Sequence, residues 1–283
     1  MYKPIKYVLL FFVFLSGLNL SHGALDDSQV NEVLLSSILE FNAEISQLPA
    51  PFLYRYNPAM IGGGFGASSA ELTIEVTTDQ STYKRSPYYL LSLTGRFAKH
   101  ERMTEDALAM LICHEIGHAI GGSPTLKRTH VDFNLPISVE GQADYFAARD
   151  CFNRVAKRIL VQEEMNYPDS IRAVCEANAD PGGHSIDECI RIIGAGYQLQ
   201  SVVVSIRNSF SNGAGELFPD PIKKASTSLV DITKETFEGH PEAQCRMDTY
   251  VAGALNKPRP GCWYYNPSTQ PHPPSSAPRV QPQ

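Results

Sequence analysis

The sequence predicts an α+β fold, mainly helical, with a small β-sheet. Apolar residues recur at helical spacing over residues 28–48, which indicates an amphipathic helix. Residues 71–78 alternate apolar and polar side chains, and residues 87–95 form a second candidate strand. At 283 residues, 43% of them hydrophobic and 19% charged, the composition is typical of a globular protein with a sizeable core.

Four further helices are predicted from the residue types that begin them. Each start has either a side chain that can cap a helix or a residue favoured in its first turn. The predicted helices are 104–121, begun by Thr104; 139–160, begun by Ser138; 186–206, begun by the capping box of Ser185 and Glu188; and one that starts at Pro241.

The N-terminus has the features of a secretory signal peptide. Lys3 and Lys6 precede an apolar run over residues 7–20, and Ser21 and Gly23 occupy the small-residue positions before a cleavage site. The run is short for a membrane span and an acidic segment follows it, although an uncleaved N-terminal membrane anchor is the alternative. We therefore expect a periplasmic or secreted protein with no stable membrane span after cleavage.

The six cysteines all follow the predicted cleavage site. An even number of cysteines in an exported protein predicts disulfides formed in an oxidising compartment. The pairing cannot be deduced from the sequence, but we expect the local pairs Cys175–Cys189 and Cys245–Cys262. Cys113 lies in an apolar helical segment, and we expect it to be a buried thiol.

One compact domain is expected over residues 24–265, between the signal peptide 1–23 and a Pro- and Ser-rich tail, 266–283, that we expect to be disordered. The glycine-rich residues 61–69 do not lie between a strand and a helix, so they predict a flexible loop rather than a phosphate site. The net charge of −6 and the lack of a basic run argue against nucleic acid or an anionic membrane as a partner.

The sequence HEIGH at residues 114–118 combines two histidines with a glutamate. His114 and His118 are four residues apart, so both lie on one face of a helix and can bind one zinc ion. Glu115 can then take a proton from a water whose pKa zinc lowers. A chance occurrence is the alternative, but the helix is apolar, and buried ionisable groups without a partner are costly.

A catalytic zinc site usually has three protein ligands, and EGQAD at residues 140–144 can provide the third. Glu140 and Asp144 share one face of the next predicted helix. One carboxylate can bind zinc while the other accepts the free N–H of a ligand histidine. An exposed acidic face is the alternative, but the neighbouring small residues favour close packing between helices.

HExxH followed by a helix that begins E-x-x-A-D resembles the gluzincin metallopeptidases, in particular the family of the HtpX heat-shock protease and the CAAX prenyl protease. The resemblance covers roughly residues 70–256 and implies a zincin-like metallopeptidase domain whose small sheet packs on the active-site helix. It implies that Glu140 is the third zinc ligand and that Asp144 supports a ligand histidine. GHPEAQCR also places His240 and Arg246 at the family spacing.

The resemblance implies that His240 faces the zinc, as a transition-state donor or as a fourth ligand in a resting state, and that Arg246 supports the site. A donor or cation there can stabilise the oxyanion formed when water attacks a peptide carbonyl. Substrate would add as a strand to an exposed sheet edge, for which residues 71–76 are the candidate.

We therefore expect an exported zinc metalloendopeptidase with one Zn²⁺ per chain, acting on protein or peptide substrates, with envelope protein quality control as one setting. Glu115 would be the general base. One alternative is a zinc-binding periplasmic chaperone or binding module of peptidase descent, although the intact Glu115 favours the enzyme. The other is a disulfide-stabilised structural protein with an accidental motif.

Overall fold

The computed structural model describes residues 24–59, 73–78, 87–126, 135–159, 167–179, 183–210, 217–221, 223 and 235–266. The predicted signal peptide, the glycine-rich loop and the tail from residue 267 onward lie outside the described residues. Within the described part the fold is α+β and mostly helical, as the sequence predicts.

Residues 28–48 form two helices instead of the single helix expected. These are α1 (Asp27–Glu40) and α2 (Asn42–Ile45). Asp26 caps α1, because its carboxylate accepts the backbone N–H of Gln29 at 2.8 Å. The helix is interrupted at Phe41, whose backbone leaves the helical region and whose buried ring packs edge-on against Phe146. A tertiary contact therefore ends a helix that the apolar spacing alone would continue.

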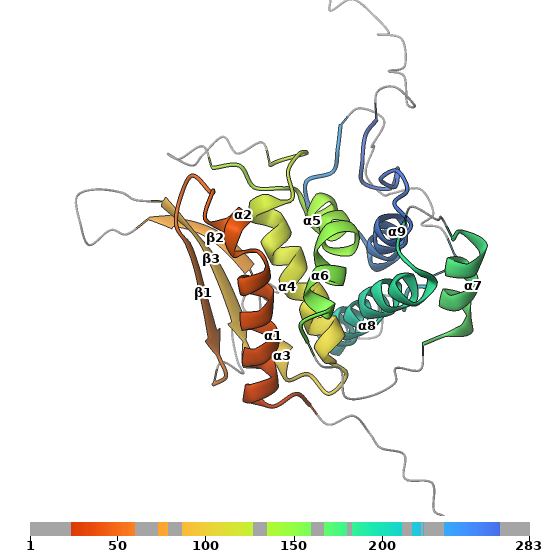
Figure 1. Ribbon diagram of the computed structural model, residues 1–283, viewed down its shortest axis with the longest axis horizontal. Helices are drawn as coiled ribbons and strands as arrows, with labels where there is room; N and C mark the ends of the chain where they lie inside the picture. The colour runs from red at the N-terminus through yellow and green to blue at the C-terminus, as the bar shows by residue number, and fades with distance from the viewer. Residues whose placement is uncertain are drawn as a thin grey trace, which may run out of the picture.

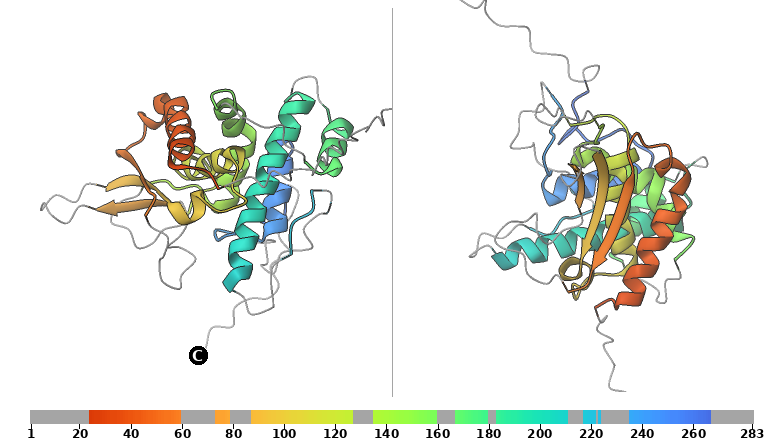
Figure 2. Two further views of the ribbon diagram at one scale, coloured as in Figure 1. Left: turned by 90° about the horizontal axis from the view of Figure 1, so that it is seen from below. Right: turned by 90° about the vertical axis from the view of Figure 1, so that its left-hand side faces the viewer.

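The described strands form one sheet in the order β1-β3-β2. They are β1 (Phe52–Asn57), β2 (Thr73–Thr78) and β3 (Pro87–Thr94). β1 is parallel to β3, whereas β2 is antiparallel to it. Among these strands β2 is at an edge, as expected for residues 71–76, and the face of the sheet is visible in the right-hand view of Figure 2.

β1 was not predicted, because most of its residues are exposed and it lacks the alternation that reveals a half-buried strand. The central strand β3 contributes most to the core: Tyr89, Leu91 and Leu93 are fully buried. The sheet packs through β2 and β3 on α4 (Glu105–Ile120), the helix that contains the HEIGH sequence.

α4 is the central helix of the molecule. Thr104 caps it as predicted, its hydroxyl accepting the backbone N–H of Ala107 at 3.1 Å. Every residue from Asp106 to Ala119 is buried. α4 lies in the middle of Figure 1 and packs against the sheet, α1 and helical segments later in the chain, so its polar residues must find partners inside the protein.

Residues 139–160 form three consecutive helical segments where one helix was expected. They are α5 (Glu140–Phe146), the π-helical turn η2 (Ala147–Cys151) and α6 (Phe152–Ala156). Turns of π-helix are rare and often occur at functional sites. Here η2 packs against α4 and α9 (Ala243–Ala254).

The prediction that Ser138 caps this helix is wrong. Val139 is the N-cap residue and makes no side-chain cap. The Ser138 hydroxyl instead donates to the carbonyl of Gly122 at 2.7 Å, and its backbone N–H donates to the carbonyl of His118 at 2.9 Å. Ser138 therefore joins the start of α5 to the end of α4. Its hydroxyl bonds the carbonyl of Gly122 instead of a backbone N–H of α5, so it does not cap the helix.

The C-terminal half is built from α7 (Asp169–Ala177), α8 (Ile186–Phe210) and α9. The capping box at the start of α8 is confirmed, since the N–H of Ser185 donates to Glu188 at 3.0 Å and the N–H of Glu188 donates to Ser185 at 3.2 Å. α9 begins at Ala243, two residues later than Pro241. α8 is apolar enough to span a membrane, but 67% of its most apolar window is buried between α4, α7 and α9, which is typical of a core helix.

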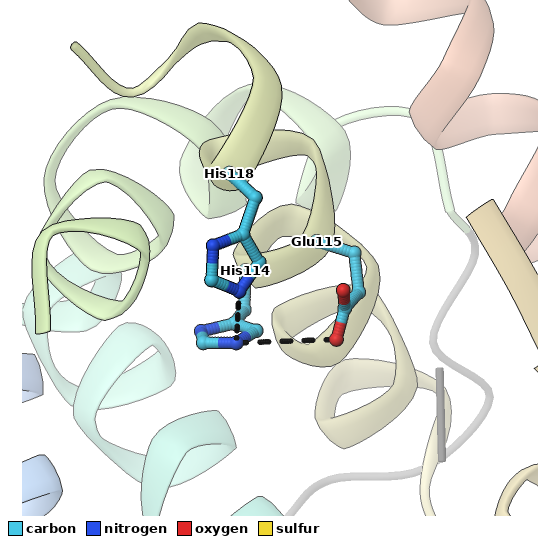
Figure 3. A group of neighbouring side chains, drawn as sticks. All are labelled: His114, Glu115 and His118. Carbon is cyan, nitrogen blue, oxygen red and sulfur yellow. Dashed lines mark hydrogen bonds and ion pairs between the residues drawn. The ribbon is translucent and has the colours of Figure 1, made fainter. Parts of the chain in front are cut away.

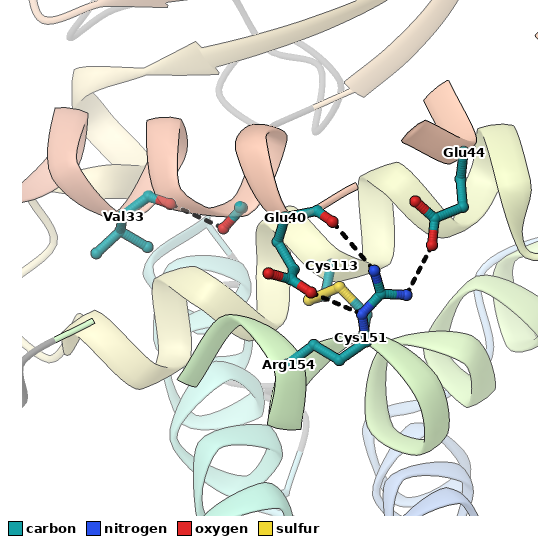
Figure 4. Close-up of a disulfide and its surroundings, with 7 residues drawn as sticks. Val33, Glu40, Glu44, Cys113, Cys151 and Arg154 are labelled. Carbon is teal, nitrogen blue, oxygen red and sulfur yellow. Dashed lines mark hydrogen bonds and ion pairs between the residues drawn. A yellow bond between two sulfur atoms is a disulfide. The ribbon is translucent and has the colours of Figure 1, made fainter. Parts of the chain in front are cut away.

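The described residues contain three disulfides. Cys175–Cys189 and Cys245–Cys262 are confirmed. The expectation of a buried Cys113 thiol is wrong, because Cys113 on α4 is bonded to Cys151 at the end of η2 (Figure 4). The two cysteines are 38 residues apart and become neighbours only when η2 packs on α4.

Removing the Cys113–Cys151 disulfide should destabilise the protein more than removing Cys175–Cys189. In the chain-entropy model the cost is about 4 kcal/mol for the longer loop and about 3 kcal/mol for the shorter one. Paired Cys→Ala variants, unfolded in urea under oxidising conditions, measure both values. The paired cysteines are 38 and 14 residues apart in the sequence. Equal losses of stability on removal of the two disulfides would contradict the prediction.

Candidate metal centre

His114 and His118 extend from one face of α4 toward a common point, with Glu115 beside them (Figure 3). Their Nε2 atoms are 3.2 Å apart. Nδ1 of His114 donates to Oδ1 of Asp144 at 2.8 Å, and Nδ1 of His118 donates to the carbonyl of Ser138 at 2.8 Å. Because Nδ1 carries a proton in each ring, the two close Nε2 atoms would both have a lone pair in the neutral rings, and these repel unless a proton or a cation lies between them.

Two carboxylates approach the same point. Oε1 of Glu115 is 3.9 Å from Nε2 of His114. Glu140, the first residue of α5, is closer: its Oε2 is 3.3 Å from Nε2 of His114 and its Oε1 is 3.6 Å from Nε2 of His118. Within the described residues, Oε2 of Glu140 is buried and accepts no hydrogen bond. An acceptor left in this state needs a cation or a donor.

Asp144 is completely buried and lies behind His114, on the side away from the metal point. Its Oδ1 accepts the Nδ1–H of His114, an N–H of Arg246 at 2.7 Å and the hydroxyl of Tyr250 at 2.9 Å. Its Oδ2 accepts the Nε–H of Arg246 at 2.8 Å. The two parallel bonds from Arg246 compensate the buried carboxylate and orient it toward His114.

The charges around the two histidines favour a positive charge between them. Burial by itself lowers the pKa of His114, but the carboxylates of Asp144 and Glu140 raise it to about 10. Burial lowers the pKa of His118 to about 4. Burial raises the pKa of Glu140, but the neighbouring histidines outweigh this effect and hold it well below its ordinary value. The cluster therefore combines imidazole nitrogens with an ionised carboxylate, which are ligand types that bind metal ions.

The close approach of α4 and α5 brings these groups together. A Cβ atom on Gly117 would lie 3.0 Å from the backbone of Ala143, so a larger residue there would separate the two helices. The small residues noted in the sequence around Glu140 thus allow helix contact, and the alternative of an exposed acidic face is excluded.

His240 and Arg246 lie at the same centre but on different sides of it. Nε2 of His240 is 3.3 Å from Oε1 of Glu140, and its side chain is 56% exposed. It therefore lies where a bound molecule can contact it. Arg246 is buried, and its guanidinium donates to both carboxylate oxygens of Asp144, behind His114. This position agrees with the supporting place that the resemblance implies for Arg246 and leaves the exposed side to His240.

The arrangement can hold a metal ion. Ligand atoms of His114, Glu115 and His118 lie within 4.8 Å of one another. The carboxylate of Glu140 lies nearer still to both imidazoles. The donor set, together with the buried Oε2 of Glu140 that lacks a donor, fits a divalent cation that prefers nitrogen and oxygen ligands.

Sequence reasoning missed three residues of the centre. Ser138 orients His118 through its backbone carbonyl, which any residue type could do, so no sequence signal marks it. Tyr250 contacts Asp144 from α9, four residues after Arg246, and Gln200 contacts Tyr250 from α8. The one available signal was the glutamine itself, a polar residue on an otherwise apolar helix face.

Comparison with known proteins finds no family model, no curated protein and no solved structure that the chain matches.

Replacing Arg246 by Gln should destabilise the metal-free protein by about 3–5 kcal/mol at pH 7, because the Asp144 carboxylate is left buried without its counter-charge. Urea unfolding measures the loss. Arg154→Gln is the matched control: Arg154 pairs with Glu40 and Glu44 at a half-exposed site, so its loss should cost roughly 0–1 kcal/mol. Equal costs for the two variants would contradict the prediction.

The stability lost on replacing Arg246 by Gln should be smaller in acid. Burial alone raises the pKa of Asp144, but Arg246 and His114 lower it to about 2, from an ordinary value of 3.8. A carboxyl whose pKa is lowered by folding stabilises the protein at pH values above its ordinary pKa. This stabilisation is lost as the pH falls through the pKa of the folded state. The stability difference between wild type and Arg246→Gln should therefore narrow between about pH 4 and pH 2. A difference that is constant with pH would contradict this account.

Proposed function

We propose that the protein is a zinc-dependent endopeptidase. The observation that carries the proposal is the meeting of His114, His118 and Glu140 at one buried point, with Glu115 beside it. Two imidazole nitrogens and one carboxylate oxygen are the ligand types and the number that catalytic zinc sites use. In this proposal zinc satisfies both Nε2 lone pairs and the buried Oε2 of Glu140.

The choice between the two carboxylates follows from distance and from position on the helices. Glu140 lies 3.3 Å and 3.6 Å from the two Nε2 atoms, whereas Glu115 lies 3.9 Å from Nε2 of His114. Glu115 follows His114 directly on α4, so its side chain is rotated away from the ligand face. It can reach the edge of the metal site without occupying a ligand position, as a general base requires.

Zinc supplies Lewis acidity, which lowers the pKa of water and polarises a peptide carbonyl. Glu115 then takes the proton from the attacking water and returns it to the leaving amine. His240, exposed beside Glu140, donates a hydrogen bond to the oxygen on which negative charge develops. Asp144 and Arg246 hold the ring of His114 in the orientation that directs Nε2 at zinc.

The proposed substrate is an extended protein or peptide segment. β2 lies at the edge of the described sheet and packs on α4, the helix that holds the histidines. A substrate strand added to this edge would form backbone hydrogen bonds and present its peptide bonds to the metal centre. This mode suits a protease that acts on unfolded proteins, because backbone pairing is independent of sequence.

We also propose that the chain belongs with the HtpX-like and CAAX-protease-like gluzincins and acts after export from the cytoplasm. The EGQAD and HPEAQCR segments support the family proposal, since each provides side chains to the same centre as HEIGH. The three disulfides of the described residues support the proposed export, because disulfides persist in oxidising compartments.

Glu115→Gln should retain zinc in a one-to-one ratio and lose hydrolysis of an unfolded protein by about 10²- to 10⁴-fold, because it removes the base but no ligand. Metal analysis and a fluorescent casein assay measure the two properties. Glu105→Gln, the same change at the start of α4, is the control and should leave both unchanged. His114→Ala should lose zinc. A Glu115→Gln variant as active as wild type would overturn the assignment of the base.

If wild type binds zinc but hydrolyses no unfolded protein, while preventing its aggregation, the chaperone alternative gains. If wild type purified without added metal contains no zinc and His114→Ala changes nothing, the metal assignment itself is wrong.

An N-methyl group on a peptide substrate should raise the KM of that peptide when it lies at a residue that pairs with β2. The methyl group removes the amide donor and obstructs the approach of the substrate strand to the sheet edge. A series of peptides with one N-methyl group moved along the chain, away from the cleaved bond, tests this. The expected result is an alternating pattern, since alternate residues of a strand face the sheet edge. A uniform KM across the series would contradict substrate addition to the edge.

A further inference from the structure

Behind the metal centre, a chain of three buried polar groups extends from α8 to Asp144. The amide of Gln200 donates to the hydroxyl of Tyr250 at 3.2 Å, and this hydroxyl donates to Oδ1 of Asp144 at 2.9 Å. All three residues have 0% exposure. The direction of donation is set at its end, because a carboxylate can only accept.

The helices are shaped to hold this tyrosine. Gly196 lies one turn before Gln200 on α8, and a Cβ atom there would lie 2.5 Å from the ring of Tyr250. Glycine at this position therefore lets the ring approach α8 closely, and its hydroxyl lies within hydrogen-bond distance of Gln200. On α9, Tyr250 follows Arg246 by one turn, so both residues reach Asp144 from one helix face.

Burying the polar groups of Gln200 and Tyr250 costs free energy that apolar side chains at these positions would not cost. Phenylalanine at position 250 would fill the same space without a hydroxyl, and leucine at position 200 would suit an apolar helix. Oε1 of Gln200 accepts no hydrogen bond within the described residues, so the glutamine is retained at a further cost. Within the described residues, the hydrogen bonds from Gln200 through Tyr250 end at Asp144.

We propose that Tyr250 is a positioning residue of the metal centre, and that Gln200 orients its hydroxyl. The hydroxyl and Arg246 both donate to Oδ1 of Asp144 and so fix the position of this oxygen, which also accepts the Nδ1–H of His114. His114 is thereby held in the tautomer and ring orientation that direct Nε2 at the metal. The proposal rests on the zinc site proposed above and extends it to α8, a helix that provides no ligand.

The test measures metal affinity, so it does not depend on peptidase activity. Zn²⁺ binding to wild type, Tyr250→Phe, Gln200→Leu and the double variant is measured by competition with a chromophoric chelator. Tyr250→Phe should weaken zinc binding about 10- to 100-fold, as removal of such supporting groups does. Gln200→Leu should weaken it less, and the double variant should match Tyr250→Phe, since Gln200 acts only through the hydroxyl.

Tyr145→Phe is the matched control. It also removes a buried hydroxyl, on α5 beside Asp144, but that hydroxyl donates to the carbonyl of Lys257 at 2.6 Å, away from the metal. This variant should bind zinc like wild type. The visible absorption bands of bound Co²⁺ provide a second reading, and they should shift in Tyr250→Phe but stay unchanged in Tyr145→Phe.

Unchanged zinc affinity in Tyr250→Phe would overturn the proposal, as would an equal loss in Tyr145→Phe, which would indicate general loosening of the fold. Additive losses in the double variant would overturn the role of Gln200. A wild type that binds zinc but cleaves nothing would refute the peptidase and leave this proposal standing, whereas a wild type without zinc affinity would refute both.

Discussion

The buried carboxylate of Asp144 is the group on which the candidate metal centre depends. It lies where α5, α4 and α9 meet, and it accepts hydrogen bonds from His114, Arg246 and Tyr250. A buried carboxylate with this many donors costs little to bury only while all of them are in place. The packing of three helices and the orientation of His114, a candidate metal ligand, are therefore set by the same interaction.

The two sides of His114 are chemically distinct as a result. One ring nitrogen faces a fixed anion that keeps it protonated, and the other faces Glu140 and His118 at the open side of the centre. The exposed His240 marks that open side, since its ring reaches Glu140 from solvent. This separation of a rigid, buried support from an accessible face is what a metal site requires if it is also to admit a substrate.

The Cys113–Cys151 disulfide lies next to this arrangement in the chain. It joins the residue before His114 to the turn that follows α5, so the helices that carry His114 and Asp144 are linked covalently as well as by packing. Outside it, Arg154 pairs with Glu40 and Glu44 and connects α1 and α2 to the same region (Figure 4). The disulfide thus fixes α4 against η2, the turn that continues α5, and the pairs of Arg154 fix α6 against α1 and α2.

Much of the centre could be predicted because it depends on spacing within a helix. His114 and His118, like Glu140 and Asp144, are four residues apart, and in any α-helix residues at this spacing share one face. The start of the helix at Thr104 could be predicted because it depends on local capping. The mainly helical α+β class follows in the same way from the spacing of apolar residues. The strand β1 escaped prediction because its exposed residues have no such pattern.

The sequence by itself thus determined which imidazole and carboxylate groups share a helix face, since that depends on residue type and local spacing. Only the tertiary structure decided which groups meet. It brought Glu140 closer to the imidazoles than Glu115, put Arg246 behind Asp144, paired Cys113 with Cys151, and recruited Tyr250 and Gln200 from helices distant in the chain. The physical reason is that these contacts form between helices, and the angle and depth at which helices pack depend on the whole core.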